Sequence, residues 1–134
     1  MARILAIDYG LRRTGLAWTD PEQRVALPLA GVETNRLWEV LLSFLPEVEK
    51  IIVGYPRKMD GSPTDMTLPV KSFYEELRRR YPHISIELVD ERLSTRAASY
   101  YMRQLPNRQR RDKTTADRLA ATILLENYLL RKQI

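Results

Sequence analysis

Cysteine is absent from this 134-residue chain, and histidine occurs only once, as His83. Without thiolates the chain can form neither a disulfide framework nor a cysteine zinc site. A single histidine gives no support to Ser-His-Asp catalysis or to zinc-histidine chemistry. Long apolar runs are missing as well, because Asp8 interrupts the run at residues 4–7, which is too short for a signal peptide or a membrane span. We therefore expect a cytoplasmic protein that does not contact a membrane.

The length of the chain suits one hydrophobic core and is too short for two. Since no repeat, low-complexity tract or linker interrupts it, we expect residues 1–134 to form a single domain. Basic residues outnumber acidic ones by 22 to 17, for a net charge of +5, and this excess favours a polyanionic partner such as nucleic acid. The excess is concentrated in residues 103–118. The other basic cluster, at residues 78–80, has a simpler explanation, because cations at the end of a helix complement its dipole.

Hydrophobic periodicity predicts an α/β fold. Three strands, at residues 3–9, 14–19 and 24–27, are separated by short turns and so form an antiparallel meander. The order then becomes helix, strand, helix, strand and two helices, which predicts a mixed five-stranded sheet. This sheet combines the three-stranded antiparallel meander with two parallel strands and carries helices on both faces. The later elements are expected at residues 34–45, with Thr34 as the N-cap, and at 50–54, 67–81, 84–89, 95–104 and 114–130, with a basic loop at 106–113.

Two acidic residues follow apolar strands. Asp8 ends the first of them, where burying a lone carboxylate is costly unless it is paired or binds a metal. Glu91 follows the last strand, and ligands of open α/β sheets bind beyond the carboxyl ends of strands. Ordinary alternatives remain for both residues. Asp8 can accept hydrogen bonds from the following turn, and Glu91 can pair with Arg92 in solvent.

A third acidic residue, Asp117, is expected in the first turn of the last helix, where a negative charge already complements the helix dipole. The small residues Ala120 and Ala121 would let this helix approach the sheet and bring Asp117 near the strand ends. Together with Asp8 and Glu91 it offers the oxygen ligands that Mg²⁺ and Mn²⁺ prefer. Two such ions can activate water and stabilise the leaving oxygen of a phosphodiester. Asp8 suits the position that bridges both ions, with the other two carboxylates at the flanks.

Basic residues border this acidic set and are expected to contact phosphates. They come from the turn after the first strand, from the loop after the strand at residues 50–54, and from the segments beside the second and third carboxylates. The expected nucleic-acid-binding residues are Arg12, Arg13, Arg57, Lys58, Arg92, Arg108, Arg110, Arg111 and Lys113.

Four short motifs resemble, in this order along the chain, those of the YqgF/RuvX family. They are IDYG at residues 7–10 with Arg13 and Gly15, VGYP and MDG within residues 53–61, DERLST at residues 90–95, and DRLAA at residues 117–121. The resemblance implies an RNase H-like fold and a divalent-metal site formed by Asp8, Glu91 and Asp117. It also implies a nuclease that cuts Holliday junctions or matures the precursor of small-subunit ribosomal RNA.

Two other functions are compatible with parts of this pattern. A non-catalytic nucleic-acid or ribosome-assembly binding protein would keep the fold, but it would tolerate loss of the three carboxylates, which are all present. A phosphotransferase of the actin and sugar-kinase superfamily also opens with an Asp-x-Gly hairpin, but it needs two domains. The sequence leaves open the choice between RNA and branched DNA and the choice between Mg²⁺ and Mn²⁺. It also leaves open whether the chain forms the homodimer that symmetric resolution of a junction requires.

Overall fold

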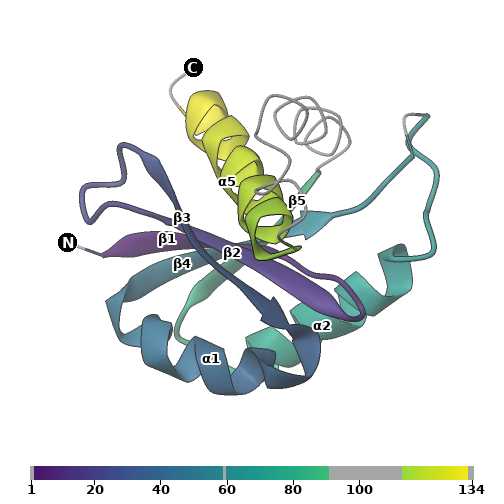
Figure 1. Ribbon diagram of the computed structural model, residues 1–134, viewed down its shortest axis with the longest axis horizontal. Coiled ribbons are helices and arrows are strands. Elements are labelled where there is room, and N and C mark those ends of the chain that lie inside the picture. The colour runs from purple at the N-terminus through teal and green to yellow at the C-terminus, as the bar shows by residue number, and fades with distance from the viewer. Residues whose placement is uncertain (1, 59, 91–112, 133–134) are drawn as a thin grey trace.

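A five-stranded sheet forms the centre of the molecule. The computed structural model describes residues 2–58, 60–90 and 113–132, and its strand order is β3-β2-β1-β4-β5 (Figure 1). The first three strands pair antiparallel, whereas β4 pairs parallel with β1 and β5 pairs parallel with β4, which confirms the predicted mixed sheet. The strands are β1 (Arg3–Asp8), β2 (Arg13–Thr19), β3 (Ala26–Glu33), β4 (Val48–Tyr55) and β5 (Ser85–Asp90), and the α-helices are α1 (Leu37–Phe44), α2 (Thr67–Arg80) and α5 (Lys113–Lys132).

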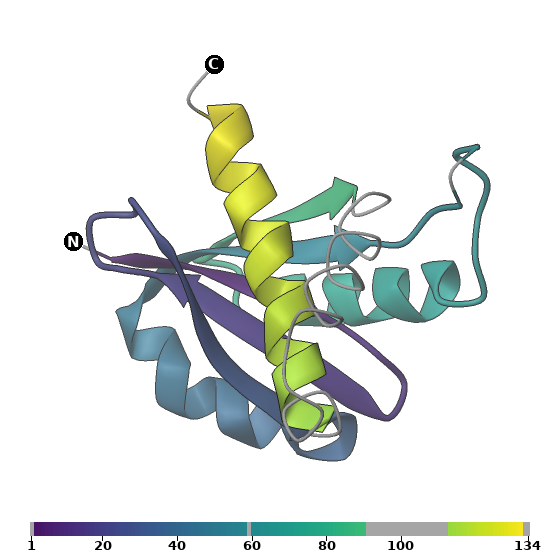
Figure 2. The ribbon, with the colours of Figure 1, turned by 45° about the horizontal axis from the view of Figure 1, so that its top comes forward.

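Helices cover both faces of this sheet, as the sequence predicts. Figure 2 shows α1 and α2 on one face and α5 on the other. The central strand β1 supplies side chains to both layers, because successive residues of a strand point to opposite faces. Leu5 and Ile7 belong to the core under α1 and α2, whereas Ile4 and Ala6 belong to the core under α5. All four residues are at most 1% exposed, so β1 is buried on both sides.

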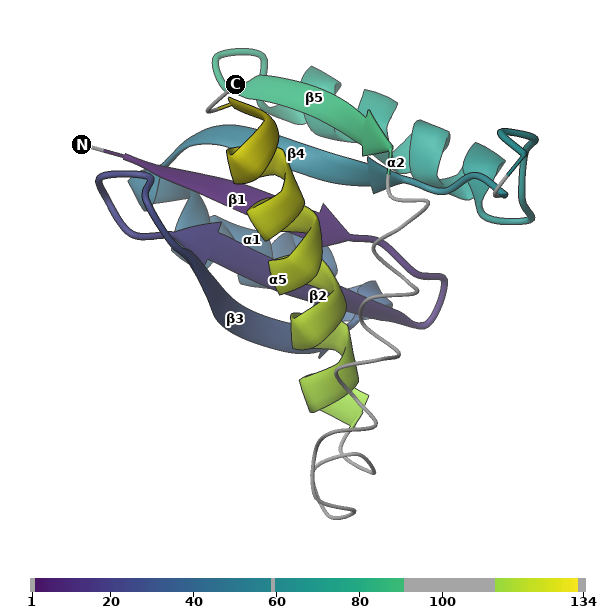
Figure 3. The ribbon, with the colours of Figure 1, turned by 90° about the horizontal axis from the view of Figure 1, so that it is seen from above.

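Helix α5 crosses β1, β2 and β3 on its own face of the sheet (Figure 3). The α5 residues that belong to the core between this helix and the sheet recur at the spacing of an amphipathic helix. They are Ala121, Leu124, Leu125, Tyr128 and Leu129. Asp117 lies one turn before Ala121, and it therefore continues the same stripe toward the strand ends.

The third strand is longer than the sequence predicts. It runs from Ala26 to Glu33 rather than over residues 24–27, and it includes Pro28. β3 lies at the edge of the sheet, which is where proline is tolerated in a strand, because an edge strand has a hydrogen-bonding neighbour on one side only. The pairing with β2 also shifts its register between Leu16 and Ala17, next to the residue that faces Pro28.

Two helix beginnings also differ from the predictions. Thr34 is not the N-cap of α1, because it opens a short 3₁₀ turn, Thr34–Arg36, and donates its hydroxyl hydrogen to the carbonyl of Gly10. Helix α5 already begins at Lys113, so Asp117 lies in the second turn rather than the first. The helix predicted at residues 95–104, and the loop predicted at 106–113 except its last residue, lie outside the described residues. Within the described part of the chain, no helix combines the length and the apolar character needed to cross a membrane.

Candidate active site at the carboxyl end of the central strand

Asp8 is the last residue of β1 and lies at the end of the sheet where the parallel strands finish. Its neighbour Ile7 pairs with Val53 near the end of β4, while Tyr55 pairs with Asp90 at the end of β5. Residues 4 and 6 face α5, so the alternation along β1 directs Asp8 to the α5 face as well. The side chain that the sequence singled out is therefore at the carboxyl edge of the sheet and on the side that α5 covers.

Two glycines allow α5 to approach this edge. Gly15 pairs with Asp8 on one side and with Gly31 on the other. A Cβ atom on Gly15 would lie 1.9 Å from the backbone oxygen of Asp117, and one on Gly31 would lie 2.8 Å from the Cα of Thr114. We call Gly15 and Gly31 the glycine platform. Since the α5 backbone at Asp117 rests directly on the platform residue next to Asp8, the two carboxylate residues occupy neighbouring positions on one face.

The platform refines the prediction about α5. Ala121 is fully buried in the core under this helix, so a small residue does help the packing, as expected. The closest approach, however, depends on glycines in β2 and β3 rather than on alanines in the helix. In the sequence, the feature that indicates this close approach is the pair of glycines, Gly15 and Gly31, which the antiparallel meander brings side by side.

Asp117 forms an ion pair with Arg13, the first residue of β2. The Nε atom of Arg13 donates a hydrogen bond of 2.7 Å to Oδ2 of Asp117. The Arg13 and Asp117 side chains are only 28% and 20% exposed, so water screens this pair less than an open surface pair. We expected Arg13 to contact nucleic acid, and that remains a prediction; the structure gives it a carboxylate partner that was not predicted from the sequence. The alternation of side chains along β2 could have predicted this pair, because it puts Arg13 on the same face of the sheet as Gly15.

A chain of hydrogen bonds fixes the turn between Asp8 and Arg13. The hydroxyls of Thr14 and Thr34 lie 2.8 Å apart, and Thr34 donates to the carbonyl of Gly10 at 2.7 Å. Gly10 is required sterically, since a Cβ atom there would lie 2.3 Å from the backbone oxygen of Arg13. The turn therefore holds the end of β1 and the start of β2 in a fixed relation.

The donor set suits a hard divalent cation, although only part of it is described. Asp8 and Asp117 lie on the same face, and carboxylate oxygens are the ligands of Mg²⁺ and Mn²⁺. Glu91, the third predicted ligand, lies outside the described residues, directly after the end of β5 at Asp90. Among residues 2–58, 60–90 and 113–132, no group of three potential metal ligands converges. Asp90 lies two residues after Leu88 in β5, so the alternation of side chains directs both residues to the same face of the sheet. Leu88 packs on the face that α1 and α2 cover, which is the face opposite to that of Asp8.

Basic residues flank this edge. Arg12 is exposed and lines a shallow hollow with Leu11, Arg13, Glu33 and Asn35. Arg57 and Lys58 are exposed in the loop after β4, and the Arg57 guanidinium lies 5.0 Å from the centre of the Tyr55 ring. Lys113 is the first residue of α5. The remaining residues predicted to bind nucleic acid lie outside the described part of the chain; they are Arg92, Arg108, Arg110 and Arg111.

The other half of α5 is held by polar contacts with β4 and β5. The Nζ atom of Lys50 lies 3.0 Å from Oε1 of Glu87, and the Tyr128 hydroxyl donates to the same oxygen at 3.4 Å. Tyr128, together with Glu87, raises the pKa of Lys50 above its usual value, although partial burial opposes this effect. These contacts help to fix α5 on the sheet, so the position of Asp117 depends on both ends of the helix.

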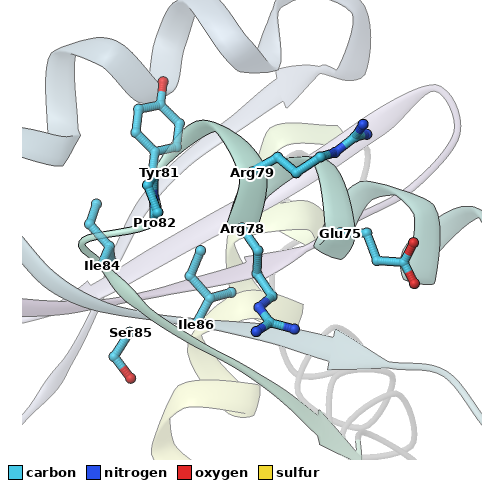
Figure 4. Close-up of a pocket in the computed structure, with 8 residues that line it drawn as sticks. All are labelled: Glu75, Arg78, Arg79, Tyr81, Pro82, Ile84, Ser85 and Ile86. Carbon is cyan, nitrogen blue, oxygen red and sulfur yellow. The ribbon is translucent and has the colours of Figure 1, made fainter.

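A second depression lies away from the carboxylates, between the end of α2 and the start of β5 (Figure 4). Since β5 begins at Ser85 beside this depression and ends at Asp90, the strand separates it from the carboxyl edge. Arg78, Arg79 and Arg80 occupy the last turn of α2, as the dipole argument predicts, and Glu76 pairs with the latter two. The depression is lined by Glu75, Arg78, Arg79, Tyr81, Pro82, Ile84, Ser85 and Ile86.

Two of the solved structures that share this fold are of RuvC. The chain superimposes on Thermus thermophilus RuvC with a TM-score of 0.57, at 16% identity, over 98% of this chain and 96% of that one. A second structure, T. thermophilus RuvC in complex with Holliday junction substrate, gives a TM-score of 0.53 at 17% identity over the same shares. At such identities the likeness concerns the fold alone, and it identifies the mixed sheet as RNase H-like.

Curated relatives match the chain at higher identity. A protein of Chlorobium phaeobacteroides is 43% identical, over 95% of this chain and 91% of its own length. A protein of Christiangramia forsetii is 38% identical, over 96% of this chain and 98% of its own length. Both relatives carry the name "putative pre-16S rRNA nuclease". A family model described as RuvX, Holliday junction resolvase, matches residues 2–131, and the chain therefore belongs to the RuvX family.

Proposed function

We propose that this protein is a metal-dependent nuclease that hydrolyses phosphodiester bonds of structured nucleic acid. The observation that carries the proposal is the convergence of Asp8 and Asp117, from opposite ends of the chain, on one face of the sheet. Like charges held side by side repel each other, so two neighbouring carboxylates at this partly buried edge favour the binding of a cation. The names of the family and of the curated relatives support nuclease chemistry over other uses of a metal site.

In this proposal Asp8, Glu91 and Asp117 hold two Mg²⁺ or Mn²⁺ ions. Such ions, when bound, lower the pKa of a coordinated water and neutralise charge on the phosphate. The protein's own contribution is to fix the carboxylates in advance. The glycine platform holds Asp117, and the hydrogen-bonded turn after β1 holds the strand end that carries Asp8. Fixed donors need little reorganisation during the reaction, which is the source of their catalytic value.

The basic residues around the edge would bind the nucleic-acid backbone. Arg12, beside its hollow, and the exposed pair Arg57 and Lys58 flank the carboxylates from two different loops. Phosphate contacts of this kind position a polyanion without reading its sequence. The substrate class that we propose is therefore a structured RNA or branched DNA, with the ribosomal RNA precursor and the Holliday junction as the two candidates that the relatives' and family names suggest. Action on a ribosomal RNA precursor would take place in the cytoplasm.

Cleavage assays test this proposal. Single-stranded RNA, a pre-16S rRNA fragment, duplex DNA and a synthetic four-way junction would each be incubated with Mg²⁺, Mn²⁺ or EDTA. We expect metal-dependent cleavage by the wild type, inhibition by EDTA, and loss of cleavage in Asp8→Asn with substrate binding retained. Glu39→Gln is the matched control, since it removes an exposed carboxylate on α1, on the opposite face of the sheet.

The alternative is a non-catalytic nucleic-acid or ribosome-assembly binding protein with the same fold. Binding without cleavage under every metal condition would support this alternative and contradict our proposal. Equal cleavage by wild type and Asp8→Asn would also contradict it, because the proposed mechanism depends on the Asp8 charge.

A further inference from the structure

Building on the proposed metal site, we propose that Arg13 is an internal counter-cation for Asp117. In the metal-free protein its guanidinium neutralises the carboxylate, and it moves away when a divalent cation binds. Arg13 would thus set the metal affinity of the site by competing with the metal for Asp117. This role differs from the nucleic-acid contact that the sequence suggested for Arg13.

The ion pair occupies one of the two carboxylate oxygens of Asp117 that a metal could use. Nε of Arg13 lies 2.7 Å from Oδ2 of Asp117, which is the short distance of a charge-assisted hydrogen bond. A Mg²⁺ ion binds carboxylate oxygens at about 2.0–2.1 Å and demands near-octahedral geometry. A guanidinium in contact with the same oxygen would intrude on that coordination shell and repel the ion. The two cations therefore compete for one carboxylate.

Asp117 does not need Arg13 to stay in place. Its backbone oxygen lies over Gly15, and its Cβ lies 3.0 Å from the position that a Cβ on Gly31 would take. The ion pair is thus added to a carboxylate that main-chain packing already fixes. Removing the guanidinium should leave Asp117 where it is and strengthen metal binding, whereas loss of a structural support would weaken it. The sign of the change separates these two roles.

A destination for the displaced side chain is present beside the site. Arg13 pairs across the sheet with Glu33, and both residues line the hollow next to the turn between β1 and β2. Glu33 is exposed, and its carboxylate offers the guanidinium a second partner of the same charge as Asp117. The side chain can therefore leave Asp117 without losing every anionic neighbour.

The experiment measures Mn²⁺ binding by titration calorimetry, without substrate. The proteins are wild type, Arg13→Gln, Arg13→Lys and Arg12→Gln. We expect Mn²⁺ to bind Arg13→Gln about fivefold more tightly than wild type, which corresponds to about 1 kcal/mol. Arg13→Lys keeps the charge but loses the planar fork, so its affinity should lie between the two. Arg12→Gln removes the same charge from the exposed neighbouring residue, and we expect its affinity within about twofold of wild type, because an exposed charge is screened.

Thermal unfolding in EDTA supplies a second readout. We expect Arg13→Gln to unfold at a lower temperature than wild type without metal, and this difference to shrink at saturating Mn²⁺. If wild type binds Mn²⁺ and Arg13→Gln binds it with equal or lower affinity, the proposed competition is wrong, but the proposed metal site is not. The competition is also overturned if Arg12→Gln tightens binding as much as Arg13→Gln. If no variant and no wild-type protein binds Mn²⁺, the proposed metal site fails and the competition fails with it.

Discussion

Gly15→Ala should lift α5 from the sheet at the position of Asp117. The added Cβ would lie 1.9 Å from the backbone oxygen of Asp117, and real Cβ contacts do not fall below 3.0 Å. Relief of the clash therefore requires a displacement of about 1.1 Å, from 1.9 to 3.0 Å, and the atom in the way is backbone rather than a flexible side-chain end. Forcing extra volume into a packed interior costs about 1–3 kcal/mol.

Two consequences are expected from this displacement. The free energy of unfolding should fall by about 1–3 kcal/mol in urea denaturation. Nuclease activity should fall by about 100-fold, because a misplacement of about 1 Å in a catalytic constellation has that effect. Without such a clash, a glycine-to-alanine change raises the free energy of unfolding by about 0.4–1 kcal/mol where the backbone is compatible, because it reduces the entropy of the unfolded chain. The expected loss of stability therefore comes from the clash.

Gly31→Ala is the matched variant. Its Cβ would lie 2.8 Å from the Cα of Thr114, so the required shift is smaller, and we expect a smaller loss of stability and activity than for Gly15→Ala. Wild-type stability and activity in Gly15→Ala would refute the reasoning, because α5 could not then rest on Gly15. A larger loss of stability and activity in Gly31→Ala than in Gly15→Ala would contradict the geometry of the glycine platform.

Three further predictions concern other parts of the fold. Thr34→Ala removes the hydrogen bond to the carbonyl of Gly10 and should lower the free energy of unfolding by about 1–2 kcal/mol in urea denaturation. The raised pKa of Lys50 means that its contribution to stability is complete below the unfolded pKa of about 10.5 and is lost as pH rises through the folded value. The difference in melting temperature between wild type and Lys50→Met should therefore vanish at strongly alkaline pH. Arg57→Ala should weaken nucleic-acid binding and reduce the slope of log affinity against log salt by about one, as measured by fluorescence anisotropy.

Each of these predictions has a control of the same chemical type. They are Asn35→Ala for the turn, Lys71→Met on the exposed side of α2, and Arg24→Ala in the turn before β3. A destabilisation by Asn35→Ala as large as that by Thr34→Ala would contradict the first prediction. A stability difference for Lys50→Met that persists unchanged at high pH would contradict the second. The third fails if Arg24→Ala and Arg57→Ala change the salt slope equally.

The sheet and its central strand were predictable because local pattern and tertiary packing agree there. The apolar run at residues 4–7 has no polar face, and the strand is in fact buried on both sides. β3 was predicted too short because Pro28 and Gly31 are local signals for a loop. In the folded protein Pro28 is tolerated at an edge, and Gly31 is needed under α5. Proline and glycine are typical of loops, but long-range contacts decide whether such residues lie in a loop or in a strand.

In the candidate site, too, the sequence predicted one part of the arrangement and missed a part that depends on long-range contacts. The prediction that Asp8 and Asp117 come close together depended on the small residues Ala120 and Ala121 in the last helix, and the fold brings the two carboxylate residues to neighbouring positions. The ion pair between Arg13 and Asp117 was missed, because charge counts along the sequence give no partner for residues separated by most of the chain. The strand alternation that relates Arg13 to Gly15 would have revealed the shared face.

Pro28 also has a consequence for how two copies of this chain could associate. An exposed edge strand can pair with the same strand of another molecule, and proteins avoid such pairing with prolines and irregular edges. β3 carries both devices, since Pro28 lacks an N–H and the ladder beside it changes register. A continuous sheet running through β3 of two subunits is therefore disfavoured. A two-fold assembly that presented two carboxylate sites to one branched substrate would therefore use a surface other than the β3 edge.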